Sequence, residues 1–214
     1  MSTTVLPFEP KQQLRCLFCR GKSCKNCGEF AYLKQANPAI PGLHSSWITE
    51  NILAMQRPND KILEKGVLQE FVKTSITVIF NLTEVILIAI LSSFITIIIL
   101  KPGEHPFCGC QELNQSSGFS YTPEKLMAVG IKHFNYSWPD MTAPRLSLLK
   151  DIIIVACNEL DRGNKIAVHC HAGYGRTGIV IACILIVRHS MTDVAAIAHV
   201  REKRKGSVQV NISM

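Results

Sequence analysis

The sequence predicts an α/β fold in which a mainly parallel central sheet is flanked by helices. Two observations predict it: short apolar runs typical of buried strands alternate with longer segments of helical periodicity, and 214 residues suffice for one domain with its own core. We expect this domain to comprise residues 40–214, and the polar, cysteine-rich residues 1–39 to form an N-terminal extension. A third observation, a glycine-containing loop between a strand and an apolar helix, marks the candidate site.

In the N-terminal half, residues 43–55 are interpreted as two strands joined by a turn. Residues 60–73 have helical periodicity, which places six apolar side chains on one face: Ile62, Leu63, Val67, Leu68, Phe71 and Val72. Residues 76–82 have the length and composition of a buried strand.

In the C-terminal half, a helix is expected over residues 121–129, with Thr122 as its cap and Pro123 at its first position. The other expected elements are a strand at 131–136, a helix at 146–160, a strand at 165–168 and helices at 178–187 and 191–203. Because ligands bind at the carboxyl ends of parallel strands, the loop that follows residue 168 is expected to lie at the binding edge.

That loop reads VHCHAGYGRTG and places five residues between Cys170 and Arg176. Backbone N–H groups at the start of a helix form a favourable site for an anion. A thiol attacks as its thiolate, which a helix N-terminus and a nearby cation both stabilise. The planar fork of an arginine binds two oxygens of a phosphate. The loop therefore predicts cleavage of a phosphate ester by a cysteine nucleophile, with no cofactor required.

The other residues of the loop have expected roles. Gly173 and Gly175 would allow positive φ and a close backbone approach. Thr177 would hydrogen-bond the cysteine sulfur and help it leave in the second step. His171 either adds a cationic edge to the pocket or faces solvent. The phosphate is expected to lie in a cradle of backbone N–H groups from His171, Ala172, Gly173, Tyr174, Gly175 and Arg176.

Asp140, in Trp138-Pro139-Asp140, is the candidate proton donor. An expelled alkoxide or phenoxide needs a proton, which a positioned carboxylic acid supplies. The same carboxylate would then activate water against the phosphocysteine. Asp151 and Asp161, in and just after a helical segment, are weaker alternatives.

His169-Cys170-x5-Arg176-Thr177-Gly178 resembles the signature loop of the cysteine-dependent protein tyrosine phosphatase superfamily, and Trp138-Pro139-Asp140 resembles its general-acid loop. HCHAGYGRTGIVIAC is most similar to an atypical dual-specificity type, the protein tyrosine phosphatase domain-containing protein 1 group. Other stretches that carry the resemblance, from about Cys16 to about Gln209, are CLFCRGKSCK, GLHSSWITENILAMQRP, KPGEHPFCG, SGFSYTPEKLM and REKRKGSVQ.

The resemblance implies that Cys170 is the nucleophile, Arg176 the phosphate clamp and Asp140 the acid. It also implies that His169 orients the nucleophile through a hydrogen bond to the backbone. Phosphotyrosine, and phosphoserine or phosphothreonine, in proteins are the implied substrates, and a phosphoinositide stays open. A cilium- or centrosome-associated role is implied by the resemblance alone.

Residues 85–100, VILIAILSSFITIIIL, carry no charge. A helix of this length spans about 24 Å, less than the roughly 30 Å hydrocarbon core of a bilayer. A membrane span here would also separate two strands, 76–82 and 165–168, that are expected to be neighbours. In the family the first strand runs almost directly into a basic residue and Pro-Gly-Glu-His, so residues 83–100 resemble an insertion. A membrane-contacting segment and a core element stay open.

The family also continues beyond the segment at 201–209, where this chain has Lys205 in place of the usual Pro, so a truncated C-terminal end is expected. Three functions therefore stay open. They are an active phosphatase, a catalytically impaired phosphate-binding or scaffold protein, and a membrane-tethered phosphatase.

The formal net charge of +7 predicts a basic surface, with part of the excess in Arg201, Lys203, Arg204 and Lys205. Such a surface suits phosphorylated substrates. Nucleic acid is not expected as a partner, because no nucleic-acid motif is present. The first fifteen residues lack the apolar region of a secretory signal, and a catalytic thiolate needs a reducing compartment, so a cytoplasmic location is expected.

Four of the nine cysteines cluster near the N-terminus. They are loose reduced thiols or, as an alternative, zinc ligands. Only four residues separate the two pairs, which is far shorter than in the usual zinc ribbons. The cysteines concerned are Cys16, Cys19, Cys24 and Cys27.

Overall fold

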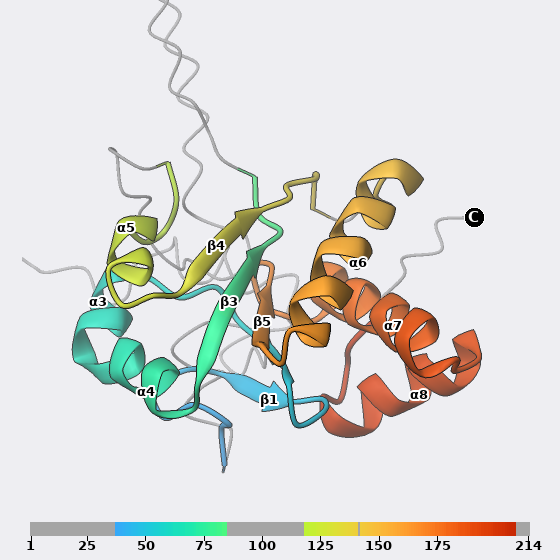
Figure 1. Cartoon of the computed structure of the whole chain (residues 1–214), viewed down its shortest axis with the longest axis horizontal. Coiled ribbons are helices and arrows are strands. Elements are labelled where there is room, and N and C mark those ends of the chain that lie inside the picture. The colour runs from blue at the N-terminus through green and yellow to red at the C-terminus, as the bar shows by residue number, and fades with distance from the viewer. Residues whose placement is uncertain (1–36, 85–117, 141, 209–214) are drawn as a thin grey trace, which may run out of the picture.

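The structure, a computed structural model, describes residues 37–84, 118–140 and 142–208 (Figure 1). The described residues form a five-stranded sheet with the order β1-β2-β5-β3-β4. Only β1 runs antiparallel to its neighbour, and the other neighbouring pairs are parallel, which confirms the predicted mainly parallel sheet. The strands are β1 (Ser45–Trp47), β2 (Ile52–Met55), β3 (Ile76–Asn81), β4 (Lys132–Asn135) and β5 (Lys165–His169).

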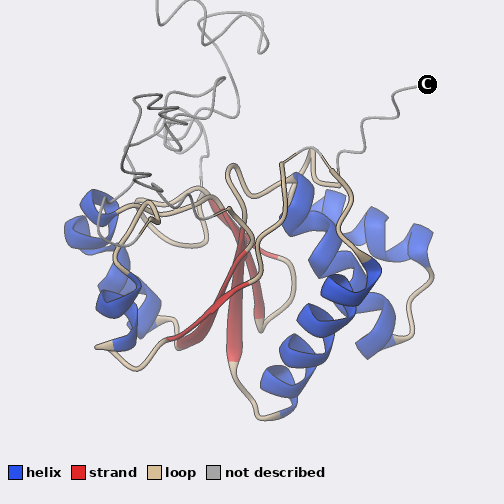
Figure 2. Cartoon of the chain, turned by 90° about the horizontal axis from the view of Figure 1, so that it is seen from above, coloured by secondary structure: helices blue, strands red, loops and turns tan. Residues whose placement is uncertain are grey.

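Helices cover both faces of this sheet, as Figure 2 shows from above. One face carries α3 (Asp60–Ile62), the π-helical turn η1 (Leu63–Val67), α4 (Leu68–Lys73) and α5 (Pro123–Met127). The other carries α6 (Leu146–Asp161), α7 (Gly175–His189) and α8 (Asp193–Lys203).

Side-chain alternation along the central strands explains the two layers. In β5, Ile166 and Val168 join the core beneath α6, α7 and α8, whereas Ala167 joins the core beneath α3 to α5. Successive side chains of a strand point to opposite faces, so a strand that is apolar throughout must be covered on both. The central strands, which are apolar on both faces, are therefore covered by helices on both sides of the sheet.

The segment at 60–73 is helical, but it is not the regular helix that the periodicity predicted. Gly66 has φ 118°, which interrupts the regular helix within the π-helical turn. Leu63, Val67 and Phe71 are buried as expected, but Val72 is 52% exposed. The prediction for Val72 was wrong because a 3.6-residue period does not run unbroken through this turn.

The start of α5 follows the predicted pattern with one difference. Pro123 occupies its first turn, and Thr122 precedes the helix but makes no side-chain capping bond. Instead, the Thr122 hydroxyl donates to the Asp60 carboxylate (3.2 Å), and the backbone N–H of Thr122 donates to the same carboxylate (3.0 Å). Thr122 therefore ties α5 to α3 rather than capping its own helix.

β3 and β5 are parallel neighbours, as the topological argument against a membrane span between them required. Residues 85–100 of the predicted insertion lie outside the described residues. Among the helices of residues 37–84, 118–140 and 142–208, none combines the length and the apolar character that a membrane crossing needs.

Candidate active site

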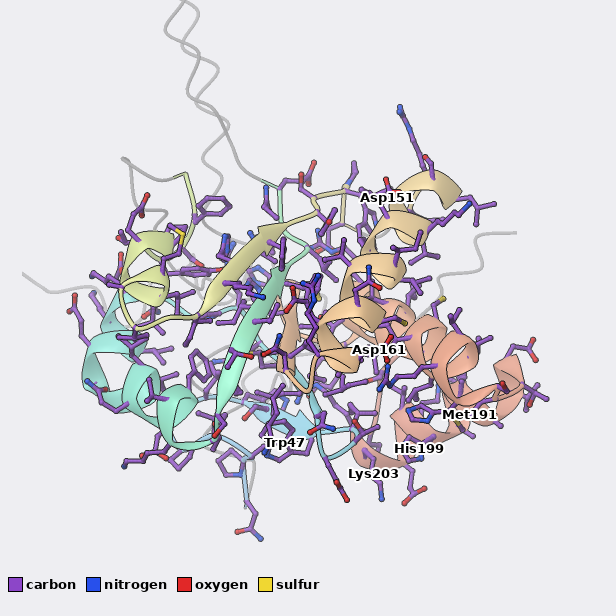
Figure 3. All side chains as sticks on the ribbon, in the orientation of Figure 1. Trp47, Asp151, Asp161, Met191, His199 and Lys203 are labelled. Atoms are coloured by element: carbon purple, nitrogen blue, oxygen red, sulfur yellow. The ribbon has the colours of Figure 1, made fainter. Side chains whose placement is uncertain are left out.

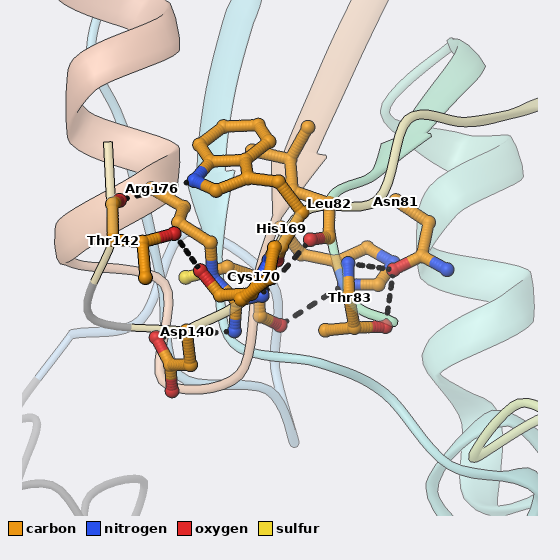
Figure 4. Close-up of polar contacts among 10 residues, drawn as sticks. Asn81, Leu82, Thr83, Asp140, Thr142, His169, Cys170 and Arg176 are labelled. Carbon is orange, nitrogen blue, oxygen red and sulfur yellow. Dashed lines mark hydrogen bonds and ion pairs between the residues drawn. The ribbon is translucent and has the colours of Figure 1, made fainter. Parts of the chain in front are cut away.

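The candidate site lies where β5 ends and α7 begins, at the carboxyl edge of the parallel strands (Figure 4). β5 ends at His169, Cys170 follows, and α7 starts at Gly175. Cys170 is 4% exposed and Arg176 is 5% exposed. The neighbouring strand β3 reaches the same edge, where the Leu82 N–H donates to the His169 carbonyl (2.9 Å).

All five carbonyl groups from Cys170 to Tyr174 accept hydrogen bonds from surrounding groups. The N–H of each following residue points opposite to that carbonyl, because the peptide bonds are trans. The N–H groups of His171 to Gly175 are therefore directed away from these partners, as an anion cradle needs. The bonds are Cys170 O from His169 Nδ1 (3.2 Å), His171 O from Arg57 N (3.0 Å), Ala172 O from Arg204 Nη2 (3.1 Å), Gly173 O from Arg204 Nε (2.7 Å), and Tyr174 O from Gly178 N and Val208 N (3.1 Å each).

Only one of the two loop glycines has the predicted role. Gly173 has φ +76°, and a Cβ there would lie 2.2 Å from the Met55 carbonyl oxygen. The loop therefore passes directly against the end of β2. Gly175 does not have positive φ, and a Cβ there would meet nothing within 4 Å. The prediction for Gly175 was wrong because this residue already has the ordinary backbone of the first helical turn.

Arg176 is held by two backbone carbonyls from separate segments. Nη1 donates to the carbonyls of Leu82 (3.0 Å) and Trp138 (2.8 Å), while Nη2 lies 3.2 Å from Asp140 Oδ1. Arg176 Nε is buried and has no hydrogen-bond partner among the described residues. A buried donor without a partner is costly, so this nitrogen fits a site that an anion completes.

Asp140 lies on the loop that Trp138 anchors. Trp138 is 4% exposed and packs in the same core as Cys170. Its indole Nε1 donates to the Thr142 carbonyl (3.2 Å), and the Thr142 hydroxyl donates to the Pro139 carbonyl (2.7 Å). The Asp140 side chain is 37% exposed, so its carboxylate contacts Arg176 on one side and solvent on the other.

The two alternative acids do not share this position. Asp151 and Asp161 both lie on α6 (Figure 3). Asp161 forms an ion pair with Arg188 of α7, and Asp151 is exposed. Of the three carboxylates, Asp140 is the one in contact with the Arg176 guanidinium.

His169 is fully buried and bonds at both ring nitrogens. A carbonyl can only accept, so Nδ1 donates to Cys170 O, which is a hydrogen bond to the backbone of the kind that the resemblance implied. Nε2 then accepts from the Tyr121 hydroxyl (2.8 Å), and the Tyr121 oxygen accepts from His133 Nε2 (2.8 Å). Burial lowers the pKa of His169 to about 3 and raises the pKa of Tyr121. His169 is therefore neutral and fixed as one tautomer.

Thr177 does not make the predicted bond to the cysteine sulfur in this structure. Its hydroxyl is fully buried and has no hydrogen-bond partner among the described residues. His171 is half-buried in the loop, which decides neither of its two predicted roles.

The sequence interpretation missed Arg204, Tyr121 and His44. Arg204 was assigned to a basic surface, yet it is 3% exposed and its guanidinium contacts two carbonyls of the loop. His44 bonds the hydroxyl of Tyr174, a loop residue (2.6 Å). The stretches that carry the family resemblance contain all three residues, but the resemblance gave no geometry to separate them from their neighbours.

The N-terminal cysteines, expected as loose reduced thiols with zinc binding as the alternative, lie outside the described residues. They are Cys16, Cys19, Cys24 and Cys27. Across the three described ranges, no group of three or more His, Cys, Asp or Glu side chains is arranged to hold a metal ion.

Comparisons with known proteins agree with this geometry. Residues 116–190 match the family model described as Tc-R-P, polymorphic toxin system, DSP-PTPase phosphatase. The protein tyrosine phosphatase domain-containing protein 1 of mouse (Mus musculus) is 41% identical over 192 residues, which cover 89% of this chain and 23% of that protein. The chain thus spans about a quarter of the length of such curated relatives.

Two further similarities concern a shorter part of the chain and the fold. The tyrosine-protein phosphatase CDC14 homolog of Schizosaccharomyces pombe is 40% identical over 92 residues, covering 43% of this chain and 17% of that protein. The crystal structure of PTPMT1 in complex with PI(5)P has a TM-score of 0.54 at 18% identity and covers 79% of this chain and 88% of that chain. The matched part of this chain is a domain of the cysteine-dependent protein tyrosine phosphatase superfamily, related to its dual-specificity phosphatases.

Proposed function

We propose that this domain hydrolyses phosphate monoesters on proteins in two steps, through a phosphate bound covalently to Cys170. The observation that carries the proposal is the loop whose five carbonyls are all bonded on its outer side, between a buried cysteine and a buried arginine. Its N–H groups and Arg176 Nε supply donors for the oxygens of a tetrahedral anion.

In the first step the Cys170 thiolate attacks phosphorus, and the bond from phosphorus to the ester oxygen breaks. Asp140 gives its proton to the departing oxygen, so the substrate hydroxyl leaves neutral. Arg176 and the loop N–H groups hold the phosphoryl oxygens, where charge develops in the transition state. The carbonyls of Leu82 and Trp138 keep the guanidinium in one orientation, which lowers the entropic cost of that grip.

In the second step water attacks the phosphocysteine and loses a proton to Asp140. The sulfur–phosphorus bond breaks, inorganic phosphate forms, and the thiolate returns. The Thr177 hydroxyl, which is buried and without a partner among the described residues, supplies a hydrogen bond to the departing sulfur once its rotor turns. No metal is required for either step.

Phosphotyrosine is the proposed substrate, with phosphoserine and phosphothreonine in addition. The similarity to proteins named tyrosine-protein phosphatase and dual-specificity phosphatase supports this class. A phosphoinositide is a second candidate, and the structural similarity to PTPMT1, which was crystallised with PI(5)P, favours testing it.

The test is turnover of an aryl phosphate by the purified chain, followed by matched phosphotyrosyl, phosphoseryl and phosphothreonyl peptides and a short-chain phosphoinositide. Cys170→Ser should abolish turnover, and mass spectrometry of the acid-quenched parent enzyme should locate the phosphate on Cys170. Cys183→Ser, which changes a half-buried cysteine of α7, is the matched control. Full activity of Cys170→Ser would overturn the mechanism.

Two other functions are separate outcomes. If the chain binds phosphate without turnover, while a variant lacking residues 83–100 turns over, this form is a phosphate-binding or scaffold protein. If active protein sediments with membranes until detergent releases it, the membrane-tethered alternative holds. We propose a cytoplasmic location, because the thiolate needs a reducing compartment.

A further inference from the structure

The guanidinium of Arg204, the residue that follows the last residue of α8, contacts the carbonyl side of the candidate phosphate-binding loop. Nε donates to the Gly173 carbonyl at 2.7 Å, and Nη2 donates to the Ala172 carbonyl at 3.1 Å. Nη1 donates to the Ser46 hydroxyl of β1 at 3.2 Å. One side chain therefore bonds two consecutive carbonyls of the loop and links them to the edge strand of the sheet.

Tyr174 adds a second contact to the same guanidinium. The ring of this loop residue lies with its centroid 4.5 Å from the guanidinium carbon of Arg204, a cation–π distance. The Tyr174 hydroxyl bonds His44 Nε2 at 2.6 Å. Burial, followed by the charge of Arg204, lowers the pKa of His44 to about 3, so this histidine is neutral. The middle of the loop, residues 172–174, is thus held from outside by Arg204 and His44.

Burying the charged guanidinium of Arg204 costs free energy, which its contacts with the loop must offset. The residue is 3% exposed, and a buried charge is expensive unless it is paired and hydrogen-bonded. Burial lowers the pKa of Arg204 to about 10, so the guanidinium remains charged at neutral pH. Among the described residues, its hydrogen bonds go to the neutral oxygens of Gly173, Ala172 and Ser46, so no carboxylate there offsets that cost. A thiolate or a phosphate on the inner side of the loop would complement the charge.

We propose that Arg204 is a positioning residue for the reaction proposed above, and that it acts by turning the Ala172 and Gly173 carbonyls away from the phosphate. A carbonyl dipole that faced inward would repel an anion and remove an N–H donor from the cradle. Arg204 holds two adjacent peptide units in the orientation in which the N–H groups of Gly173 and Tyr174 face the phosphate. It touches neither the substrate nor the reacting atoms.

The geometry separates this role from a purely electrostatic one. A lysine would keep the positive charge behind the loop, but its single ammonium cannot span both carbonyls in a planar fork or stack flat on Tyr174. The proposal therefore predicts that Arg204→Lys loses much of the activity, whereas a charge effect alone predicts that it keeps the activity.

The experiment compares Arg204→Met, Arg204→Lys and Arg204→Ala with the parent chain. Steady-state kinetics on an aryl phosphate give kcat and KM, calorimetry gives the Kd of inorganic phosphate, and thermal unfolding gives Tm. Arg188→Ala is the matched control, because it removes an arginine from the last turn of α7 that pairs with Asp161.

We expect Arg204→Met to lower kcat/KM about 100-fold, near the effect of losing one preorganised donor. Arg204→Lys should recover less than about one tenth of the parent activity, because it lacks the fork. Added guanidinium ion should raise the activity of Arg204→Ala and leave that of Arg188→Ala unchanged. Weaker phosphate binding should accompany each loss.

Phosphate binding keeps this inference separate from the proposed function. If the parent chain binds phosphate but does not turn over, and Arg204→Met weakens that binding, the proposed function fails and the positioning role stands. A parent-like kcat/KM and phosphate Kd in Arg204→Met, with only Tm lowered, would show that Arg204 is merely structural. If Arg204→Met does not fold, Arg204→Lys decides, and parent-like activity in it overturns the proposal.

Discussion

Arg176 Nη2 lies 3.2 Å from Asp140 Oδ1, so the candidate phosphate clamp and the candidate proton donor are in direct contact. The contact joins α7 to the loop after β4, two segments far apart in the sequence. The Asp140 carboxylate also lies beside the guanidinium that a phosphate would bind, so its negative charge would repel the charge of that phosphate. Asp140 therefore has two opposing effects: it supplies a proton for turnover and disfavours a dianion in the empty site.

Asp140→Asn should lower kcat and tighten phosphate binding together. Loss of a positioned acid costs about 10²–10⁴ in rate, while removing the carboxylate charge removes its repulsion of the dianion. Asp151→Asn and Asp161→Asn, on α6, are the controls and should retain the parent kcat. Kinetics on aryl phosphates and calorimetry with inorganic phosphate measure both effects. A kcat that survives Asp140→Asn but falls in either control would assign the acid elsewhere.

Gly173→Ala should destabilise the domain and disable the loop. Its Cβ would lie 2.2 Å from a backbone oxygen of Met55, and neither backbone can move freely. We expect a loss of about 2–4 kcal/mol in the free energy of unfolding. Gly130→Ala is the control for the backbone conformation, because Gly130 has φ +82° with nothing within 4 Å of its Cβ position.

The Gly130→Ala variant should lose only about 1 kcal/mol, the cost of a left-handed alanine. Denaturant unfolding measures both losses. Equal losses in the two variants would show that the contact with Met55 carries no cost.

Tyr121→Phe should loosen the orientation of His169, whose ring bonds the backbone carbonyl of Cys170. Without the hydroxyl, His169 Nε2 is left buried without its donor, which costs about 1–3 kcal/mol. We expect a lower Tm together with a several-fold fall in kcat, since the ring that bonds the Cys170 carbonyl gains freedom. Tyr136→Phe, whose ring packs near Phe80, is the control. An unchanged kcat in Tyr121→Phe would show that the bond from Tyr121 to His169 is not needed for catalysis.

Stability should fall on acidification below pH 6.5 because three histidines, the buried His44 and His169 and the half-buried His133, stay neutral in the folded domain. Burial is the main cause that lowers the pKa of His44 and His169 to about 3 and that of His133 to about 4, from 6.5. Between pH 6.5 and about 4 the unfolded chain takes up these protons and the folded chain does not. Each such histidine makes stability decrease with falling pH by up to about 1.4 kcal/mol per pH unit.

Denaturant unfolding at a series of pH values measures this slope. His133→Asn should reduce the slope by the contribution of one proton, up to about 1.4 kcal/mol per pH unit. His189→Gln, which changes an exposed histidine, is the control. A slope that His133→Asn leaves unchanged would show that His133 titrates normally in the folded domain.

Residue types and their spacing were enough to identify the groups that carry the chemistry and the order of the helices and strands. Cys170, Arg176 and Asp140 were identified from spacing and residue type, because a phosphate-cleaving loop needs a thiol and a guanidinium within one turn. Strands and helices followed from apolar runs and periodicity, since these local patterns report burial. Two predictions were wrong because the local backbone geometry differs from the expected one. They are the buried position of Val72 and the positive φ of Gly175.

The contacts that hold the site together could not be predicted from the sequence and are visible only in the folded domain. Arg204 lies at the end of the last described helix, His44 just before the first strand, and Tyr121 before α5, so no local pattern connects them to Cys170. A basic run near the C-terminus is ordinarily a solvated face, and only packing shows that Arg204 is buried against two loop carbonyls. The reacting groups can be identified from their spacing because they lie within short segments of the sequence. The groups that orient them come from distant segments, which only the folded chain brings into contact.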